Sequence, residues 1–140
     1  MHDFTLSTDG GSRGNPGPSG AGAVIQDGSG TIVKEISEDL GTMTNNQAEY
    51  SALIFGLEAL CELGATGKDI LVRMDSELIV QQLKGAYKVK NVGLKPLYDR
   101  AIELIDSLGG VSFTHVLRHL NTRADALVNA AIDKAQGIRS

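Results

Sequence analysis

The sequence has few of the residues that cross-link secreted domains or anchor a chain in a membrane. Cysteine occurs once in 140 residues, at Cys61, so an internal disulfide is excluded and a reducing, cytoplasmic setting is expected. No apolar run approaches the length of a membrane span, and the N-terminus lacks the basic and apolar regions of a signal peptide. We therefore expect a cytoplasmic protein with no membrane partner.

Positive charge is also scarce, which limits the surfaces on which a polyanion can bind. The chain has 13 basic and 17 acidic residues and a net charge of −4, a balance that argues weakly against a nucleic-acid partner. The lysines are unevenly distributed, because Lys84, Lys88, Lys90 and Lys95 lie close together. Local charge can therefore be positive where the overall charge is not.

The chain is nevertheless rich enough in apolar residues, at 41%, to bury a core, and residues 1–140 are expected to form a single domain. Apolar alternation and turn signals predict the first part as an antiparallel meander followed by a helix and a strand. The expected elements are strands near 3–8, 20–26 and 31–40, a helix near 46–63 and a strand near 69–75. A crossover helix between two strands implies that they pair in parallel.

The second half of the chain also shows helical and strand patterns. A short helix through Leu83, a helix that begins near Pro96, a strand over 111–117 and a helix over 122–136 are expected. The sum is an α/β fold with a mixed five-stranded sheet, three antiparallel strands followed by two parallel ones, flanked by helices.

Two aspartates close apolar alternating segments. The segment that ends at Asp9 is expected to break at Gly10-Gly11, and the one that ends at Asp75 breaks at Ser76, a good helix cap. One aspartate after a strand is most often a turn former, so either residue alone carries little weight. As a pair on adjacent parallel strands, the two carboxylates would share the sheet edge where ligand sites gather.

Two further carboxylates occur near helix starts. Glu49 shares the apolar stripe of its helix with Leu53 and Leu60, and Asp125 opens the last helix. Both positions are also explained by the helix dipole, which favours acidic residues near a helix N-terminus. Four acids on elements that can pack around one sheet edge would form an all-oxygen site suited to Mg²⁺ or Mn²⁺.

Four sequence blocks together resemble ribonuclease H type 1, and they span essentially the whole chain in the same order. The blocks are Thr8 to Pro18, Thr44 to Glu49, Asp75-Ser76 and Asn121 to Asp125. The resemblance implies a ribonuclease H-like fold and endonucleolytic hydrolysis of the RNA strand of an RNA–DNA hybrid. It implies that Asp9, Glu49, Asp75 and Asp125 hold two Mg²⁺ or Mn²⁺ ions. It also favours a monomer that uses no small-molecule cofactor.

The same resemblance assigns substrate contacts, for which turn formation and helix capping are the alternative roles. Gly10, Gly11 and Ser12 would allow close approach of the backbone, and Ser76 would reach a ribose hydroxyl. The residues expected to contact the DNA strand are Asn15, Thr44, Asn45 and Asn46.

The segment 84–91 is too short for the basic protrusion that many family members carry, so the chain resembles the branch that lacks it. Lys84, Lys88 and Lys90 are candidate phosphate contacts, with a solvated charged loop as the alternative. His119 and Arg118 are both candidates for assisting proton transfer or product release beside the fourth carboxylate.

Two rival functions stay open on sequence alone. One is a different metal-dependent nuclease of the same fold, since a fold by itself does not define a substrate. The other is a catalytically silent nucleic-acid binding module, which would give no reason for four intact carboxylates.

Overall fold

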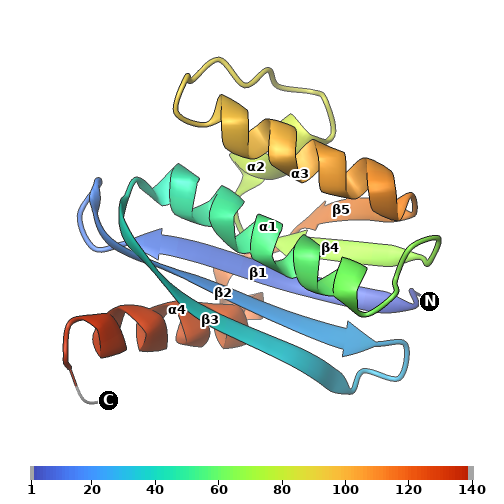
Figure 1. Cartoon of the computed structure of the whole chain (residues 1–140), viewed down its shortest axis with the longest axis horizontal. Coiled ribbons are helices and arrows are strands. Elements are labelled where there is room, and N and C mark those ends of the chain that lie inside the picture. Colours follow the sequence, from blue (N-terminus) through green and yellow to red (C-terminus); the bar gives the residue numbers. More distant parts are fainter. Residues whose placement is uncertain (1, 139–140) are drawn as a thin grey trace.

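The structure is a computed structural model that describes residues 2–138, and it is organised around one five-stranded sheet with strand order β3-β2-β1-β4-β5 (Figure 1). The strands are β1 (Phe4–Ser12), β2 (Gly17–Asp27), β3 (Ile32–Met43), β4 (Ile70–Met74) and β5 (Val111–His115). The helices are α1 (Asn45–Glu62), α2 (Glu77–Leu83), α3 (Lys95–Leu108) and α4 (Thr122–Ala135), with a short 3-10 turn over Arg118–Leu120.

The pairing of the strands confirms the predicted mixed sheet. β1 pairs antiparallel with β2, and β2 pairs antiparallel with β3, whereas β1 with β4 and β4 with β5 are parallel. The helix α1 makes the crossover between β3 and β4, which brings β4 back beside the first strand. As a result, Asp9 on β1 lies next to the end of β4, where Asp75 follows.

Helices cover the two faces of the sheet. The helix α1 packs on one face, where Leu6, Leu53, Leu57 and Val72 are all fully buried in the core. The helix α4 lies on the opposite face, against β2 and β3 (Figure 1). The side of the sheet on which a residue lies therefore decides which helix it meets.

The start of α1 is fixed by its own sequence. Thr44 and Gln47 form a capping box, in which the Thr44 hydroxyl accepts from the Gln47 N–H and the Gln47 side chain accepts from the Thr44 N–H. At the other end, Gly64 adopts a positive φ of 75°, a conformation that favours glycine and ends the helix. The predicted helix over 46–63 is thus confirmed to within a residue at each end.

The prediction that the first strand breaks at Gly10-Gly11 is wrong. β1 continues through both glycines to Ser12, so Asp9 lies inside the strand rather than at its end. Gly10 serves close packing instead of a turn. A Cβ on Gly10 would collide with the Ala48 carbonyl carbon on α1, so a larger residue would push the helix away.

The other boundary differences concern strand ends. β2 begins at Gly17 and β3 extends to Met43, because these two segments stay paired beyond the predicted ends. β5 ends at His115, and the chain turns through a 3-10 helix that the sequence pattern does not reveal. Each difference lies close to the edge where the carboxylates gather.

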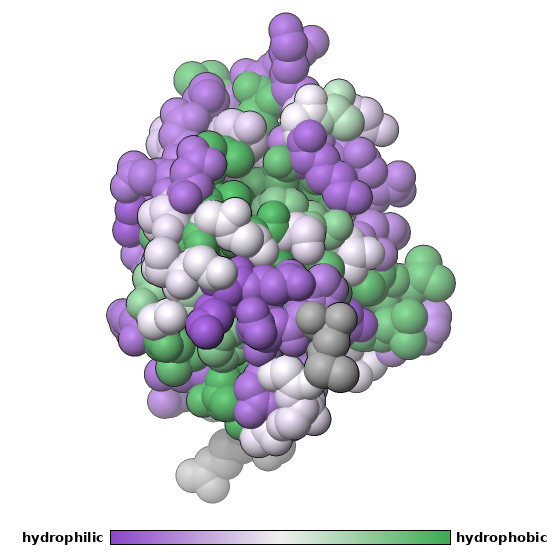
Figure 2. All heavy atoms as spheres, turned by 90° about the vertical axis from the view of Figure 1, so that its right-hand side faces the viewer, coloured by the Kyte–Doolittle hydropathy of each residue, from purple (hydrophilic) through white to green (hydrophobic). Residues whose placement is uncertain are grey.

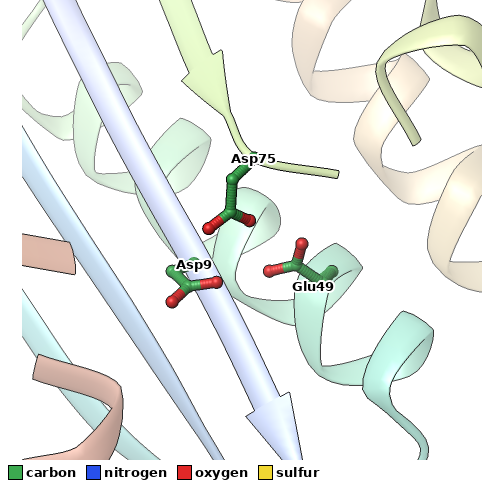
Figure 3. Close-up of side chains that lie close together, drawn as sticks. All are labelled: Asp9, Glu49 and Asp75. Carbon is green, nitrogen blue, oxygen red and sulfur yellow. The ribbon is translucent and has the colours of Figure 1, made fainter. Parts of the chain in front are cut away.

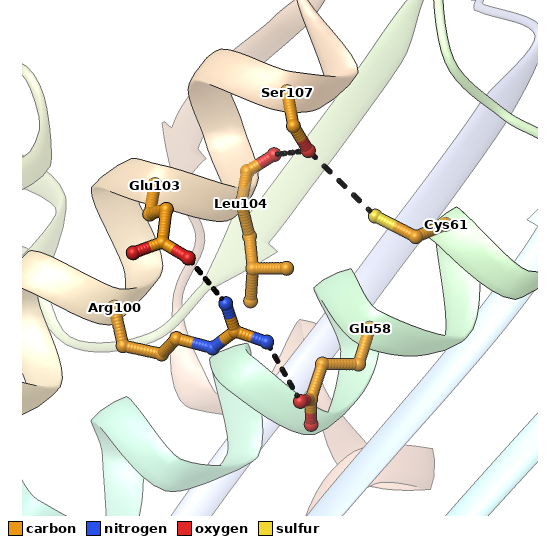
Figure 4. A network of polar contacts seen from close by, with 6 residues as sticks. All are labelled: Glu58, Cys61, Arg100, Glu103, Leu104 and Ser107. Carbon is orange, nitrogen blue, oxygen red and sulfur yellow. Dashed lines mark hydrogen bonds and ion pairs between the residues drawn. The ribbon is translucent and has the colours of Figure 1, made fainter.

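The helix α3 lies beside α1 and is joined to it by a polar seam on the surface (Figure 4). Arg100 donates to Glu103 on its own helix at 2.7 Å and to Glu58 on α1 at 3.2 Å. Cys61 is half-buried, and its thiol lies 3.9 Å from the Ser107 hydroxyl on α3. This seam is structural and lies outside the carboxylate site.

At the end of the sheet opposite the carboxylates, groups of hydrophobic residues lie at the surface among hydrophilic ones (Figure 2). Figure 2 faces the side on which β1 begins, and hydrophilic and hydrophobic residues alternate across it. Among residues 2–138, no helix is both long enough and apolar enough to cross a membrane.

Candidate active site

Three carboxylates from separate elements converge at one end of the sheet. Asp9 comes from within β1, Asp75 follows the last residue of β4, and Glu49 comes from the second turn of α1. Each offers a carboxylate oxygen that lies within 4.8 Å of those of the other two, and the three side chains point toward a common centre (Figure 3). Such a cluster of oxygen donors suits a hard divalent cation.

The packing of α1 on β1 makes this convergence possible. Because Gly10 has no side chain, the α1 backbone approaches β1 closely enough for the Gly10 N–H to donate to a Glu49 carboxylate oxygen. Glu49 is only 6% exposed, as the sequence pattern predicted, and Asp9 is 8% exposed. Two acids are therefore held together away from water.

This arrangement shifts the acidity of both groups. Burial, and then the charge of Asp75, raises the pKa of Asp9 from 3.8 to about 7. Burial, and then the nearby charge of Asp9, also raises the pKa of Glu49 well above its ordinary value. One Asp75 oxygen is buried with no hydrogen-bond partner among the described residues. A divalent cation would compensate the repulsion and supply that missing partner, so the donor set fits a metal site.

Asp125 lies beside this cluster but outside its tight group. It comes from the first turn of α4, and it raises the pKa of Asp9 both through its charge and as a side-chain hydrogen-bond partner. Asp125 is half-buried, and its carboxylate is also 3.5 Å from the Asn129 amide. The four predicted acids thus occupy one end of the sheet. Asp9 interacts with each of the other three, either through the electrostatic effect of their charges or through a side-chain hydrogen bond.

A groove of about 500 Å³ opens over the carboxylates. Besides Asp9, Glu49 and Asp75, it is lined by Gly10, Gly11, Ser12, Asn45, Asn46, Ser76 and Arg118. The Ser76 hydroxyl also caps α2 by accepting from the Ile79 N–H at 3.4 Å, so the capping role predicted as an alternative is present. Many of the residues singled out in the sequence therefore line one surface.

A second hollow of about 420 Å³ adjoins the groove and shares Asn45 and Asn46 with it. The Asn15 side-chain oxygen accepts from the Asn45 N–H at 3.0 Å, and the Asn45 side-chain oxygen accepts from the Ser12 N–H at 2.9 Å. Because an amide oxygen is engaged in each case, the donating NH₂ group is the part that is left for a ligand.

Two residues that sequence reasoning missed line the same hollow in the same manner. The Gln47 oxygen accepts from the Thr44 N–H at 3.0 Å, and the Asn91 oxygen accepts from the Gly93 N–H at 2.8 Å. The capping-box pattern could have identified Gln47, whereas Asn91 lies in a segment without any period. The hollow is thus lined by amide donors held in place by the backbone, which suits an acceptor-rich ligand such as a phosphate group.

Other candidates lie outside both hollows. Arg118 lines the groove over the carboxylates, but the neighbouring His119 is exposed and is not among the lining residues. Lys84, Lys88 and Lys90 are exposed on the connection between α2 and α3, which contains no helix. These lysines are positioned as an exposed basic loop rather than as part of the groove.

Comparison with known proteins places this chain in a family. The family model described as "Reverse transcriptase-like" matches residues 7–131. The Ribonuclease HI of Halobacterium salinarum is 48% identical over 127 residues, which cover 91% of this chain and 63% of that protein. The bifunctional protein of Mycobacterium tuberculosis is 44% identical over 93% of this chain, which spans 35% of its length. The chain thus spans less than two thirds of these relatives.

Solved structures that resemble this chain belong to the same family. LC11-RNase H1, isolated from compost by a metagenomic approach, is 47% identical and superposes with a TM-score of 0.92 over 97% of this chain and 99% of its own. The same protein has been solved in complex with an RNA/DNA hybrid, with a TM-score of 0.91 and coverage of 95% and 99%. The chain belongs to the ribonuclease H family, and its predicted fold class is confirmed.

Proposed function

We propose that this protein is an endonuclease that hydrolyses the RNA strand of RNA–DNA hybrids with the help of two divalent cations. The observation that carries the proposal is the cluster of Asp9, Glu49 and Asp75 at the floor of an open groove, in a chain of the ribonuclease H family. A buried acidic cluster of this kind is unfavourable without a cation, so a metal-dependent activity accounts for its presence.

The four carboxylates are the residues that would hold Mg²⁺ or Mn²⁺. Asp9, Glu49 and Asp75 supply the tight donor set, and Asp125 approaches Asp9 from α4. When bound, a pair of such cations activates water and stabilises the leaving 3′-oxygen of an in-line displacement. The protein contributes fixed oxygen donors and the open groove of about 500 Å³ above them.

The two strands of the hybrid would bind to different parts of this surface, one in the groove and the other in the amide-lined hollow. The RNA strand lies over the carboxylates, where Gly10, Gly11 and Ser12 leave room for close approach and Ser76 reaches a ribose hydroxyl. The DNA strand lies across the hollow, where the Asn15, Asn45 and Gln47 amides donate to phosphate oxygens or base edges. Asn45 and Asn46 line both hollows and thus lie between the places proposed for the two strands.

The basic loop and the Arg118 turn would complete the substrate surface. The exposed lysines Lys84, Lys88 and Lys90 supply phosphate contacts on a chain with a net charge of −4. They take this part in place of a longer basic protrusion. Arg118 is better placed than His119 to assist proton transfer or product release, because it lines the groove.

We further propose that residues 1–140 act as one catalytic unit, that the unit is a monomer without a small-molecule cofactor, and that it works in the cytoplasm. The sheet, both hollows and all four carboxylates come from one chain, so the arrangement needs no second copy. Sedimentation of the purified protein, alone and with hybrid, tests the monomer.

The test is cleavage of an end-labelled RNA–DNA hybrid with Mg²⁺, with Mn²⁺ and with EDTA, by the wild type and by Asp75→Asn. We expect cutting with either metal, none in EDTA, and a loss of at least about 100-fold in the variant. The matched control is Asp99→Asn, which removes an exposed carboxylate that pairs with Lys95 at 2.7 Å on α3. Binding of hybrid without cutting in either metal would favour the silent module.

A further inference from the structure

Asn121 is a buried amide that none of the assigned roles explains. It is 3% exposed, and its side-chain NH₂ donates to the Thr8 carbonyl oxygen at 2.9 Å, across 113 positions of sequence. Asn121 is the N-cap residue of α4, yet its side chain makes no capping hydrogen bond to that helix. The side chain therefore serves β1 rather than the helix that it precedes.

This one residue joins the segments that carry the carboxylates. Thr8 directly precedes Asp9 and pairs with Met74, the last residue of β4 before Asp75. On the other side, the Asn121 carbonyl oxygen accepts from the Asp125 N–H at 3.2 Å. Through its side chain Asn121 holds β1, and through its main chain it holds the first turn of α4.

The amide is a poor choice for stability alone. Its side-chain oxygen is buried and has no hydrogen-bond partner among the described residues. An unpaired buried acceptor is unfavourable, so the bond to Thr8 is offset within the same side chain. A residue that served only to pack or cap this position would not carry that cost.

We propose that Asn121 is a positioning residue, which sets the distance between Asp125 on α4 and Asp9 on β1. The inference rests on the proposed function, because it concerns carboxylates that would hold a divalent cation. Asn121 itself is not among the residues that line the groove. Groups that orient metal-binding side chains in this way affect metal affinity and turnover rather than substrate binding.

The test compares Asn121→Ser and Asn121→Ala with the wild type. Serine is a good N-cap residue, so it preserves the start of α4, but it is too short to hold the Thr8 carbonyl. The matched control is Ser37→Ala, which removes a 2.7 Å bond from a side chain on β3 to the Leu127 carbonyl of α4. That bond also ties α4 to the sheet, but it is made by β3, a strand that carries none of the four carboxylates.

We expect both Asn121 variants to lower kcat for the hybrid about tenfold or more and to leave KM within about twofold. Their affinity for Mn²⁺ alone, measured by calorimetry without substrate, falls by a similar factor. Their Tm stays within about 4 °C of the wild type, because the lost bond and the removed unpaired oxygen offset each other. Ser37→Ala leaves kcat and Mn²⁺ affinity unchanged.

Three results would overturn the proposal. One is unchanged kcat and Mn²⁺ affinity in both variants. Another is full rescue by Asn121→Ser of a loss seen in Asn121→Ala, which would assign a capping role. The third is a loss of kcat that disappears when rates are corrected for the folded fraction. A wild type that binds Mn²⁺ without cutting hybrid contradicts the proposed function instead, and Mn²⁺ affinity then still tests Asn121.

Discussion

Replacing Asp9 with asparagine should make the metal-free protein more stable while it abolishes activity. Asp9 is 8% exposed, and burial together with Asp75 raises its pKa from 3.8 to about 7. One pKa unit corresponds to about 1.4 kcal/mol, so the ionised side chain opposes folding by at most about 4 kcal/mol. Local relaxation and water penetration reduce such penalties, and we expect a gain of about 1–3 kcal/mol for Asp9→Asn at pH 8.

The gain in folding stability of Asp9→Asn over the wild type should increase as pH rises. Between pH 4 and 7 the folded protein retains the Asp9 proton while the unfolded chain has released it, so the folded state of the wild type loses stability as pH rises. Asparagine does not titrate, and the difference between the two proteins therefore grows from a small value near pH 4 to its full size above pH 7. Burial and the charge of Asp9 also raise the pKa of Glu49, so Glu49 likewise makes the folded state less stable as pH rises.

Urea denaturation in EDTA at pH 4.5 and pH 8 measures this difference directly. With Mg²⁺ added at pH 8, the wild type should recover stability, because a ligand that binds only the folded state stabilises it, and Asp9→Asn should recover less. A variant that is no more stable than the wild type at pH 8 without metal would refute the reasoning. It would mean that the carboxylates are not held together as a repulsive group in the folded protein.

Three further predictions address the rest of the site. Gly10→Ala should cost about 1–3 kcal/mol and most of the activity, because the added Cβ meets Ala48 on α1; thermal denaturation and hybrid cleavage would show both. Replacing the three lysines within 84–90 by glutamine should reduce the salt dependence of hybrid binding by up to about 2–3 in log–log slope, measured by fluorescence anisotropy; an unchanged slope would make them a solvated loop. Arg118→Ala should lower kcat about tenfold or more, whereas His119→Ala should stay within about twofold, and the reverse order in steady-state kinetics would assign the role to the histidine.

Local sequence signals were sufficient for most of the fold. The Thr44–Gln47 capping box and the glycine at position 64 mark the two ends of α1 because capping depends on neighbouring residues. The burial of Glu49 followed from its place on an apolar stripe. Parallel pairing of β1 and β4 followed from the crossover helix between them, which restricts the topologies that are possible.

Features set by contacts between distant segments could not be predicted from local sequence signals. Gly10 looks like a turn residue in sequence, but it pairs with Ala21 inside the sheet, and the approach of Ala48 on α1 leaves no room for a side chain there. The orientation of the Asn15 amide depends on the Asn45 N–H, thirty positions away in sequence. The link from Asn121 to Thr8 crosses nearly the whole chain and has no local signature.

The most direct test of the central claim is a side-by-side digestion, with Mg²⁺, of a labelled RNA–DNA hybrid, the same RNA as a single strand, the RNA duplex and the DNA duplex, followed by analysis of the product ends. The account predicts that only the RNA strand of the hybrid is cut and that its fragments carry 5′-phosphate and 3′-hydroxyl ends, because water attacks and the 3′-oxygen leaves. Preferential cutting of another duplex, or fragments that end in a 2′,3′-cyclic phosphate, would contradict it.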